Sequence, residues 1–138
     1  MTLDELLERA RARIVRLTPA EAHTAAASGA VIVDTRSDSD RERLGVVPGS
    51  IHIPRTALEW RLAPSSPWRN PHVDGAAHVI VLCAEGYSSS LAAANLVELG
   101  VAAGDVVGGF AGWRAAGLPV VEAPPREAGE RPGMGPPR

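Results

Sequence analysis

The sequence contains one cysteine among 138 residues, and this scarcity excludes several kinds of site. One cysteine cannot form a disulfide within the chain, nor the paired Cys-x-x-Cys motifs of zinc ribbons and thioredoxins. The four histidines are scattered and show no metal-ligand spacing above chance, so we expect neither a metal nor a cofactor. Any chemistry of the cysteine sulfur must therefore use an external partner.

The sequence also lacks a strong excess of charge and any long apolar run. The formal net charge is −2 and the pI is about 6.1, which gives no basic field for nucleic acid or an anionic membrane surface. No apolar run approaches the ~18 residues of a membrane span, and the N-terminus lacks the charged-then-apolar layout of a secretory signal. We expect a cytoplasmic protein that binds neither nucleic acid nor membrane.

The chain divides into three parts by composition. Apolar residues recur at helical spacing from Leu3, which predicts an amphipathic surface helix in residues 1–13. Residues 14–121 have the length of one ordinary domain. Residues 122–138 are rich in proline and glycine, which predicts a disordered tail or a linker.

Strand and helix patterns alternate within residues 14–121. Strands are expected at 14–17, 31–33, 51–54, 79–82 and 106–107. Helices are expected at 19–28, 37–44, 56–62 and 91–99, and the segment 108–113 leads into a last short helix that ends at Gly117. The segment 63–76 is a long loop with several prolines and serines. The runs at 31–33 and 79–82 are continuously apolar, which is typical of strands buried on both faces of a parallel sheet. The sequence therefore predicts an α/β fold with a mainly parallel sheet and helices on both faces.

The strand at 79–82 ends at Cys83, and a helical pattern begins almost at once. The loop 83–88 must curl over the start of that helix, so its backbone N–H groups and the helix dipole form a cradle for an anion such as a thiolate. The serines at 88–90 offer N-cap hydroxyls. A thiol beside a helix N-terminus has a lowered pKa and is a nucleophile near neutral pH. A buried structural cysteine is the alternative, and the loop favours the nucleophile.

Other polar residues follow or flank predicted strands. Asp34 and Arg36 come after the strand 31–33, and ligands bind outside the carboxyl ends of parallel strands, so these two are expected on the same edge as Cys83. A structural ion pair is the alternative. His52 alternates with two isoleucines, which favours a hydrogen-bonded surface histidine over a catalytic base.

Together these motifs resemble the rhodanese, or sulfurtransferase, domain family from about Leu17 to Val121. The motifs occur in the family's order: Asp34-x-Arg36, the Gly-Val-Val-Pro-Gly-Ser turn at 45–50, the Cys83 loop before a Ser-Ser-x-Leu-Ala-Ala helix, and Gly-Gly-x-x-x-Trp at 108–113 before Gly-Leu-Pro at 117–119. The resemblance implies a rhodanese-like fold. It also implies that a cysteine thiolate takes a sulfane sulfur, becomes a persulfide and passes the sulfur to a nucleophile.

The resemblance assigns roles to particular residues. Cys83 is the implied catalytic residue, and the implied substrate-binding residues are Ala84, Glu85, Gly86, Tyr87, Ser88, Ser89, Asp34 and Arg36. The implied partners are a small-molecule or protein-bound sulfane-sulfur donor and a thiol or cyanide-like acceptor. The sequence identifies neither of them, nor the oligomeric state.

Three features depart from the family pattern. Val46 stands where a histidine is common, one more residue lies between Arg36 and Gly45, and the loop after Cys83 has no Arg or Lys. Thiosulfate donors are dianions, which a guanidinium in the loop would help to bind and Glu85 would repel. We therefore expect thiosulfate to be a poor donor and a less charged persulfide or polysulfide to be preferred.

Two other functions stay open at this point. A phosphatase or arsenate reductase of related fold needs an arginine at the end of a Cys-x5-Arg loop, where this chain has Ser89, so it is less favoured. A non-catalytic rhodanese-like binding or regulatory module would use the same loop for protein contacts. The presence of Cys83 argues against that module.

Overall fold

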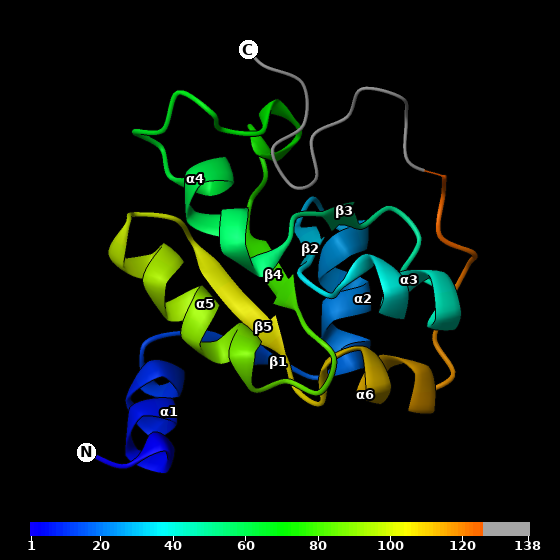
Figure 1. Cartoon of the computed structure of the whole chain (residues 1–138), viewed down its shortest axis with the longest axis horizontal. Coiled ribbons are helices and arrows are strands. Elements are labelled where there is room, and N and C mark those ends of the chain that lie inside the picture. Colours follow the sequence, from blue (N-terminus) through cyan, green and yellow to red (C-terminus); the bar gives the residue numbers. More distant parts are fainter. Residues whose placement is uncertain (126–138) are drawn as a thin grey trace.

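The computed structural model describes residues 1–125, which form a parallel sheet between two layers of helices (Figure 1). The sheet has five strands in the order β1-β5-β4-β2-β3, and every pair of neighbours is parallel. The strands are β1 Val15–Leu17, β2 Val31–Asp34, β3 Ile51–His52, β4 Val79–Leu82 and β5 Ala103–Val106. The expected α/β class with a parallel sheet and helices on both faces is confirmed.

Helices cover both faces of the sheet. They are α1 Leu3–Ala12, α2 Pro19–Ala27, α3 Asp38–Leu44, α4 Leu58–Leu62, α5 Ser88–Glu98 and α6 Gly109–Ala115, with short 3-10 turns at Arg55–Ala57 and Pro71–Val73. α4 and α5 pack on one face of the sheet, and α2 and α6 pack on the other. None of the helices within residues 1–125 is long and apolar enough to cross a membrane.

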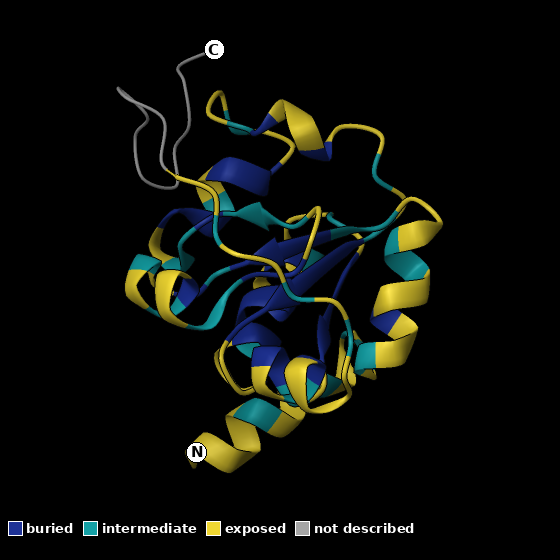
Figure 2. Cartoon of the chain, turned by 90° about the vertical axis from the view of Figure 1, so that its right-hand side faces the viewer, coloured by how far each residue is buried: buried dark blue, intermediate teal, exposed yellow. Residues whose placement is uncertain are grey.

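β4 lies at the centre of this arrangement, and all four of its residues are buried (Figure 2). Val79 and Val81 face the α4 and α5 side, whereas Ile80 and Leu82 face the α2 and α6 side. Because both faces of this strand contact apolar helices, its sequence is a continuous apolar run and does not alternate. The prediction for residues 79–82 is confirmed residue for residue.

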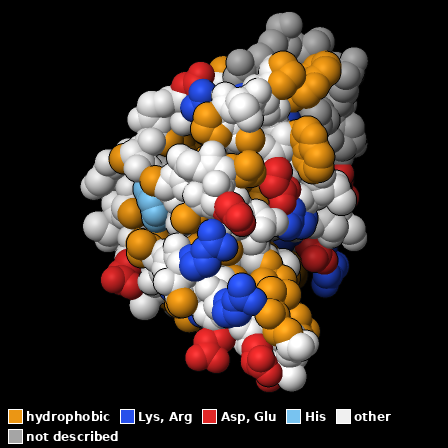
Figure 3. Space-filling model, turned by 90° about the vertical axis from the view of Figure 1, so that its left-hand side faces the viewer, with side chains coloured by type: hydrophobic (Ala, Val, Ile, Leu, Met, Phe, Trp, Pro, Cys, Tyr) orange, Lys and Arg blue, Asp and Glu red, His pale blue; other side chains and the backbone are white. Residues whose placement is uncertain are grey.

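α1 packs across α5 on the outside of one helical layer. Its N-cap is Thr2, whose hydroxyl accepts a hydrogen bond from the Glu5 amide, and only Ala10 is buried among its residues. Figure 3 shows this side of the molecule, where apolar, basic and acidic side chains are intermixed. α1 is therefore the amphipathic surface helix that the sequence predicts.

One predicted strand is misplaced. β5 occupies Ala103–Val106, not 106–107, because two of its residues do not belong to an apolar run. A Cβ at Gly104 would lie 2.1 Å from the Val15 carbonyl oxygen of the neighbouring strand, so this position excludes every side chain. Asp105 is fully buried but bound by polar partners described below. Periodicity alone could not identify such a strand.

The last described segment, near residue 121, pairs with the segment that follows α3. Val46 and Val121 form an isolated antiparallel bridge, in which each backbone N–H donates to the other residue's carbonyl, with N to O distances of 2.8 and 2.9 Å. The expected disordered tail at 122–138 lies, from residue 126 onward, outside the described residues.

An ion cluster at the end of β2 links three parts of the fold. The Arg36 guanidinium binds the fully buried Asp34 carboxylate at 2.8 and 3.1 Å, and its Nη2 also donates to the Gly45 carbonyl at 2.8 Å. Arg41 of α3 lies 3.4 Å from the same carboxylate. The Arg36 guanidinium also lies 3.7 Å above the centre of the Phe110 ring in α6. This cluster joins the sheet to α3 and α6.

We predict that Asp34→Ala lowers the free energy of unfolding by about 3–5 kcal/mol, because it leaves a buried guanidinium without its counter-charge. Urea unfolding measures the change. Asp40→Ala is the matched control, since that carboxylate pairs with Arg43 at the surface and should hardly shift the midpoint. Equal effects of the two substitutions would contradict a stabilising role for the buried cluster.

Candidate active site

Cys83 directly follows β4 and is 6% exposed. β4 is flanked by β2 and β5, so the cysteine stands at the end of the most enclosed strand of the sheet. The chain then turns through residues 84–87 into α5. The Gly86 amide donates a hydrogen bond to Sγ with an N to S distance of 3.1 Å. The sulfur therefore faces the inner side of this turn, which we call the Cys83 loop (residues 83–88).

The start of α6 holds the first half of the Cys83 loop by its backbone. The Phe110 N–H donates to the Cys83 carbonyl at 2.8 Å, and the Ala111 N–H donates to the Ala84 carbonyl at 3.0 Å. None of the described peptide bonds is cis, and in a trans peptide the N–H points opposite to the C=O. Since both carbonyls face α6, the amides of Ala84 and Glu85 are directed away from α6, toward the inside of the loop.

Two glycines make this close approach possible. Gly86 has a φ of +89°, and a Cβ there would lie 2.8 Å from the Gly108 nitrogen. Gly109 has a φ of +58°, and a Cβ there would lie 2.5 Å from the Cys83 carbonyl oxygen. Any side chain at either position would separate the loop from α6 and would also be strained. The glycines thus permit the carbonyl contacts that turn the loop amides inward.

The N-terminus of α5 is left uncapped by side chains. The serines at 88–90 were expected to supply an N-cap hydroxyl, but that prediction is wrong. The N-cap is Tyr87, which makes no side-chain capping bond, and the serines form the first helical turn. The positive end of this eleven-residue helix therefore faces the Cys83 loop, where it stabilises a negative charge.

The Cys83 thiol is acidified by its surroundings. Burial raises its pKa, but hydrogen bonds from the Ser89 hydroxyl and amide, the Ser88 hydroxyl and the Gly86 amide outweigh burial and lower the pKa below that of an ordinary cysteine. Ser89 has one hydroxyl hydrogen, and its 2.8 Å contact to Asp105 competes for it. Whether the Ser89 hydroxyl donates to Asp105 or to Cys83, the backbone amides and the Ser88 hydroxyl can still donate to the thiolate.

A buried carboxylate supports the start of α5 from behind. Asp105 of β5 is fully buried and accepts hydrogen bonds from the Ser89 and Ser90 hydroxyls at 2.8 and 2.7 Å. Arg16 of β1 neutralises it, with a 2.9 Å contact from Nε to Oδ1. Asp105 was not among the expected site residues. The sequence shows only that Asp105 directly precedes the apolar pair at 106–107, which does not indicate that its carboxylate is buried.

Two arginines reach the Cys83 loop from outside it. Arg11 Nη2 and Arg16 Nη2 donate to the Gly86 carbonyl at 2.9 and 3.0 Å. The Arg11 guanidinium also lies 5.6 Å from the centre of the Tyr87 ring. The loop sequence has no basic residue, yet guanidinium groups lie against its backbone. The sequence offered no way to find them, because they lie 70 or more positions away.

The other expected site residues fall into two groups. Ala84, Glu85, Tyr87 and Ser88 are exposed along the Cys83 loop, where an incoming molecule can reach them. Asp34 and Arg36 are instead buried and bound to each other, as in the structural ion pair that the sequence left open. They support α6, and through it the loop; their expected contact with substrate stays a prediction.

His52 donates a hydrogen bond from Nε2 to the Arg36 carbonyl oxygen, with an N to O distance of 2.8 Å. Burial is the main cause that lowers its pKa. A half-buried, hydrogen-bonded histidine is what the sequence predicts. Its bond to the Arg36 carbonyl links it to the ion cluster at the end of β2.

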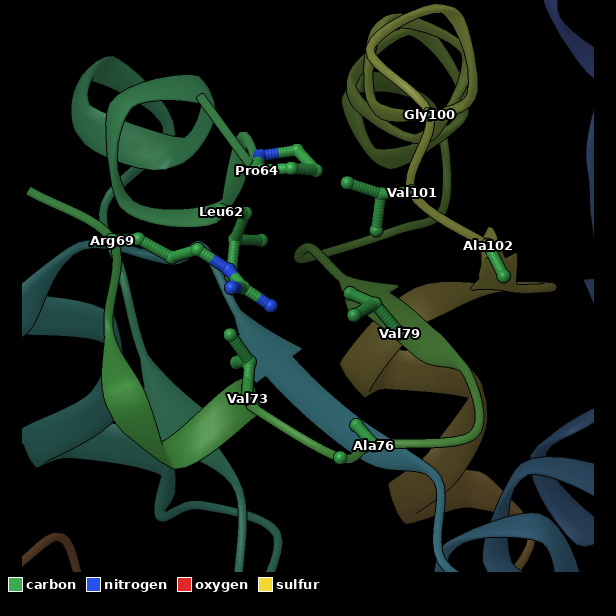
Figure 4. A pocket seen from close by; sticks show the side chains of 10 residues that line it. Leu62, Pro64, Arg69, Val73, Ala76, Val79, Gly100, Val101 and Ala102 are labelled. Atoms are coloured by element: carbon green, nitrogen blue, oxygen red, sulfur yellow. The ribbon is translucent and has the colours of Figure 1, made fainter. Parts of the chain in front are cut away.

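A cavity lies at the end of β4 opposite to Cys83 (Figure 4). It has a volume of about 170 Å³ and is lined mostly by apolar side chains, among them Leu62, Val73, Val79 and Val101. Val79 is the first residue of β4, whereas Cys83 follows its last residue. The cavity is therefore separate from the cysteine. Among residues 1–125, no group of His, Cys, Asp or Glu side chains has the arrangement of a metal site.

We predict that alkylation of Cys83 by iodoacetamide increases with pH along a curve whose midpoint lies below that of an ordinary thiol, because a lowered pKa supplies thiolate at lower pH. Ser88→Ala should move the midpoint upward and reduce the neutral-pH rate about threefold, the effect of one lost hydrogen bond of roughly 0.5–1.5 kcal/mol. Ser65→Ala is the control on another segment. If the wild-type midpoint lies at or above that of an ordinary cysteine, the loop amides do not stabilise the thiolate and the proposed anion cradle is contradicted.

Comparisons with known proteins agree on one family. The sequence matches the rhodanese-like domain family over residues 18–116. No curated protein matches it significantly. A solved protein of unknown function from Rhodopseudomonas palustris, described as a possible tyrosine phosphatase, has 35% identity and a TM-score of 0.80 over 88% of this chain and 95% of its own.

Two further structures share the fold. A rhodanese-related protein from Thermoplasma volcanium has 26% identity and a TM-score of 0.61, over 79% of this chain and 97% of its own. A thiosulfate sulfurtransferase from Pseudomonas aeruginosa has 24% identity and a TM-score of 0.68, over 90% of this chain but only 23% of its own. With the family match over most of the described domain, these likenesses show that the chain belongs to the rhodanese-like domain family.

Proposed function

We propose that this protein is a sulfurtransferase that carries sulfane sulfur as a persulfide on Cys83. The observation that carries the proposal is the position of Sγ inside a loop whose amides face inward, 3.1 Å from the Gly86 nitrogen and beside the uncapped start of α5. Such a site stabilises an anion on sulfur without any side-chain cation in the loop. A persulfide is an anion of this kind.

The transfer needs no redox partner. In the first step the Cys83 thiolate attacks the outer sulfur of a sulfane donor, the sulfur–sulfur bond of the donor breaks, and the donor remnant leaves with the electron pair. In the second step a nucleophilic acceptor, such as a thiolate or cyanide, attacks the outer sulfur of the persulfide. The Cys83 thiolate leaves with the electron pair of the broken bond, and the enzyme returns to its starting state.

The lowered pKa of Cys83 serves both steps. It provides the attacking thiolate in the first step, and it makes the same sulfur a good leaving group in the second. Ala84, Glu85, Tyr87 and Ser88 are the exposed residues of the Cys83 loop, so donor and acceptor are expected to approach over the same residues. One face of the protein therefore handles both reactants in turn.

The name of the Rhodopseudomonas palustris relative raises phosphatase activity as a second candidate. A phosphoryl group needs a guanidinium within the loop, and position 89 holds a buried serine bound to Asp105. Arg11 and Arg16 bind the carbonyl of Gly86 and so lie on the outer side of the loop. The geometry favours sulfur transfer, and turnover of p-nitrophenyl phosphate by the wild type but not by Cys83→Ser would reverse this preference.

We predict that incubation with a sulfane donor adds one sulfur atom to the intact protein, as measured by mass spectrometry. The adduct should be absent in Cys83→Ser and should disappear from the wild type when a thiol acceptor is added. No adduct with a polysulfide, thiosulfate or mercaptopyruvate would contradict the proposal. An unreactive thiol in the same samples would instead favour a non-catalytic binding module.

We predict that Glu85→Arg raises kcat/KM for thiosulfate about tenfold at low ionic strength, chiefly by lowering KM, because it replaces a repelling charge near the dianion with an attracting one. The gain should shrink as salt is added. Glu42→Arg makes the same charge change at an exposed position of α3 and should not alter the kinetics. Unchanged thiosulfate kinetics of Glu85→Arg would show that Glu85 faces only solvent.

A further inference from the structure

The N-terminal helix α1 lies outside the residues that match the family, yet it contacts the Cys83 loop. The family match covers residues 18–116, whereas α1 covers Leu3–Ala12. Charges of both signs are intermixed on this side of the molecule, so the face does not form a basic surface for a polyanion (Figure 3). The particular contacts of one arginine, Arg11, distinguish α1 from a helix that only covers the domain.

Arg11 makes three contacts with the loop and the start of α5. Its Nη2 donates to the Gly86 carbonyl at 2.9 Å, its Nε donates to the Ser90 hydroxyl at 3.1 Å, and its guanidinium lies 5.6 Å from the centre of the Tyr87 ring. Ser90 in turn donates to the buried Asp105. The planar guanidinium fork therefore joins the loop backbone to the polar cluster behind α5.

These contacts set the direction of one peptide group. The Gly86 carbonyl accepts from Arg11 and Arg16, which hold it on the outside of the loop. Because the peptide is trans, the Tyr87 N–H of the same group points the opposite way, toward the inside of the loop. α6 does the same for the amides of Ala84 and Glu85. The two arginines therefore orient the Tyr87 amide toward the inside of the loop, as the start of α6 orients the amides of Ala84 and Glu85.

The two arginines differ in their charge environment. Arg16 is paired with the Asp105 carboxylate at 2.9 Å, so its charge is largely neutralised. Arg11 has no carboxylate within ion-pair distance among residues 1–125, and its Nε and Nη2 partners are a hydroxyl and a carbonyl. Of the two arginines, Arg11 therefore has the positive charge that is not neutralised by a described carboxylate and can stabilise an anion in the loop.

We propose that Arg11 is a positioning residue for the Cys83 loop: it fixes the peptide between Gly86 and Tyr87 so that the Tyr87 amide faces the cysteine sulfur, and it supplies from α1 the positive charge that the loop sequence lacks. The inference rests on the proposed function in so far as the anion is a persulfide. The same contacts also act on the thiolate, which can be measured without any sulfur donor.

The test compares Arg11→Ala, Arg11→Gln and Arg11→Lys with wild type, with Arg9→Ala as the control on the same helix. Arg9 is exposed and its described contact is with the sulfur of Met1. The readouts are the pKa of Cys83 from thiolate absorbance against pH, and the rate of sulfur loading from a polysulfide. Circular dichroism and the thermal midpoint report whether each variant is folded.

Arg11→Ala should raise the pKa of Cys83 by about half a unit to one unit, a threefold to tenfold loss of thiolate below the pKa. Arg11→Gln should behave similarly, since it keeps hydrogen-bonding groups but no charge. Arg11→Lys should recover part of the shift, and the differences should shrink with added salt. Arg9→Ala should match wild type.

A folded Arg11→Ala or Arg11→Gln with the wild-type pKa and loading rate would overturn the inference, even if the wild type transfers sulfur. If Arg11→Ala does not fold, the comparison of Arg11→Gln with Arg11→Lys decides, and equal pKa values for those two would also overturn it. A raised pKa in a protein that never accepts sulfur would instead keep the positioning role and remove the proposed function.

Discussion

The site depends on two backbone hydrogen bonds from the start of α6 to the carbonyls of Cys83 and Ala84. They turn the carbonyls outward and leave the amides of Ala84 and Glu85 directed toward the sulfur. They form only because β4 and β5 are neighbours and because Gly86 and Gly109 let the two turns approach. The surroundings of the Cys83 sulfur thus depend on two segments that are distant in sequence, the Cys83 loop and the start of α6.

The electrostatics of the site come mainly from the backbone and not from side chains of the loop. The cradle consists of amides and the start of α5, while the nearby full charges lie behind the backbone and partly cancel, as between Arg16 and Asp105. A cradle of this kind favours a compact anion on sulfur over a bulky dianion, which would also meet the exposed Glu85. This agrees with a preference for persulfide or polysulfide donors under the proposed function.

The fold was largely predictable because its main signals are local. The central strand, the loop and the following helix appear as an apolar run, a glycine turn and a periodic pattern within residues 79–99. The predicted position of β5 is wrong because Gly104 lies against the backbone of β1 and the Asp105 carboxylate is paired with Arg16, which is far away in the sequence. Neither reason is visible in a short window of sequence.

The candidate site was predictable only in part. The sequence identifies the cysteine and its loop, but it wrongly predicts the serines at 88–90 as caps, whereas they form the first turn of α5. The contacts of Arg11 and Arg16 with Gly86, and of Arg16 with Asp105, join residues 70 to 89 positions apart, which no local pattern encodes. Buried polar partners of this kind are determined by the packing of the elements.

The most direct test of the central claim is a crystal structure of the protein after loading with a polysulfide. The account predicts that the outer sulfur on Cys83 lies inside the loop, within hydrogen-bond distance of several amides of residues 84–88, and that the carbonyls of Cys83, Ala84 and Gly86 still point outward. An outer sulfur that points into solvent, or that is bound by a side chain while these carbonyls turn inward, would contradict it.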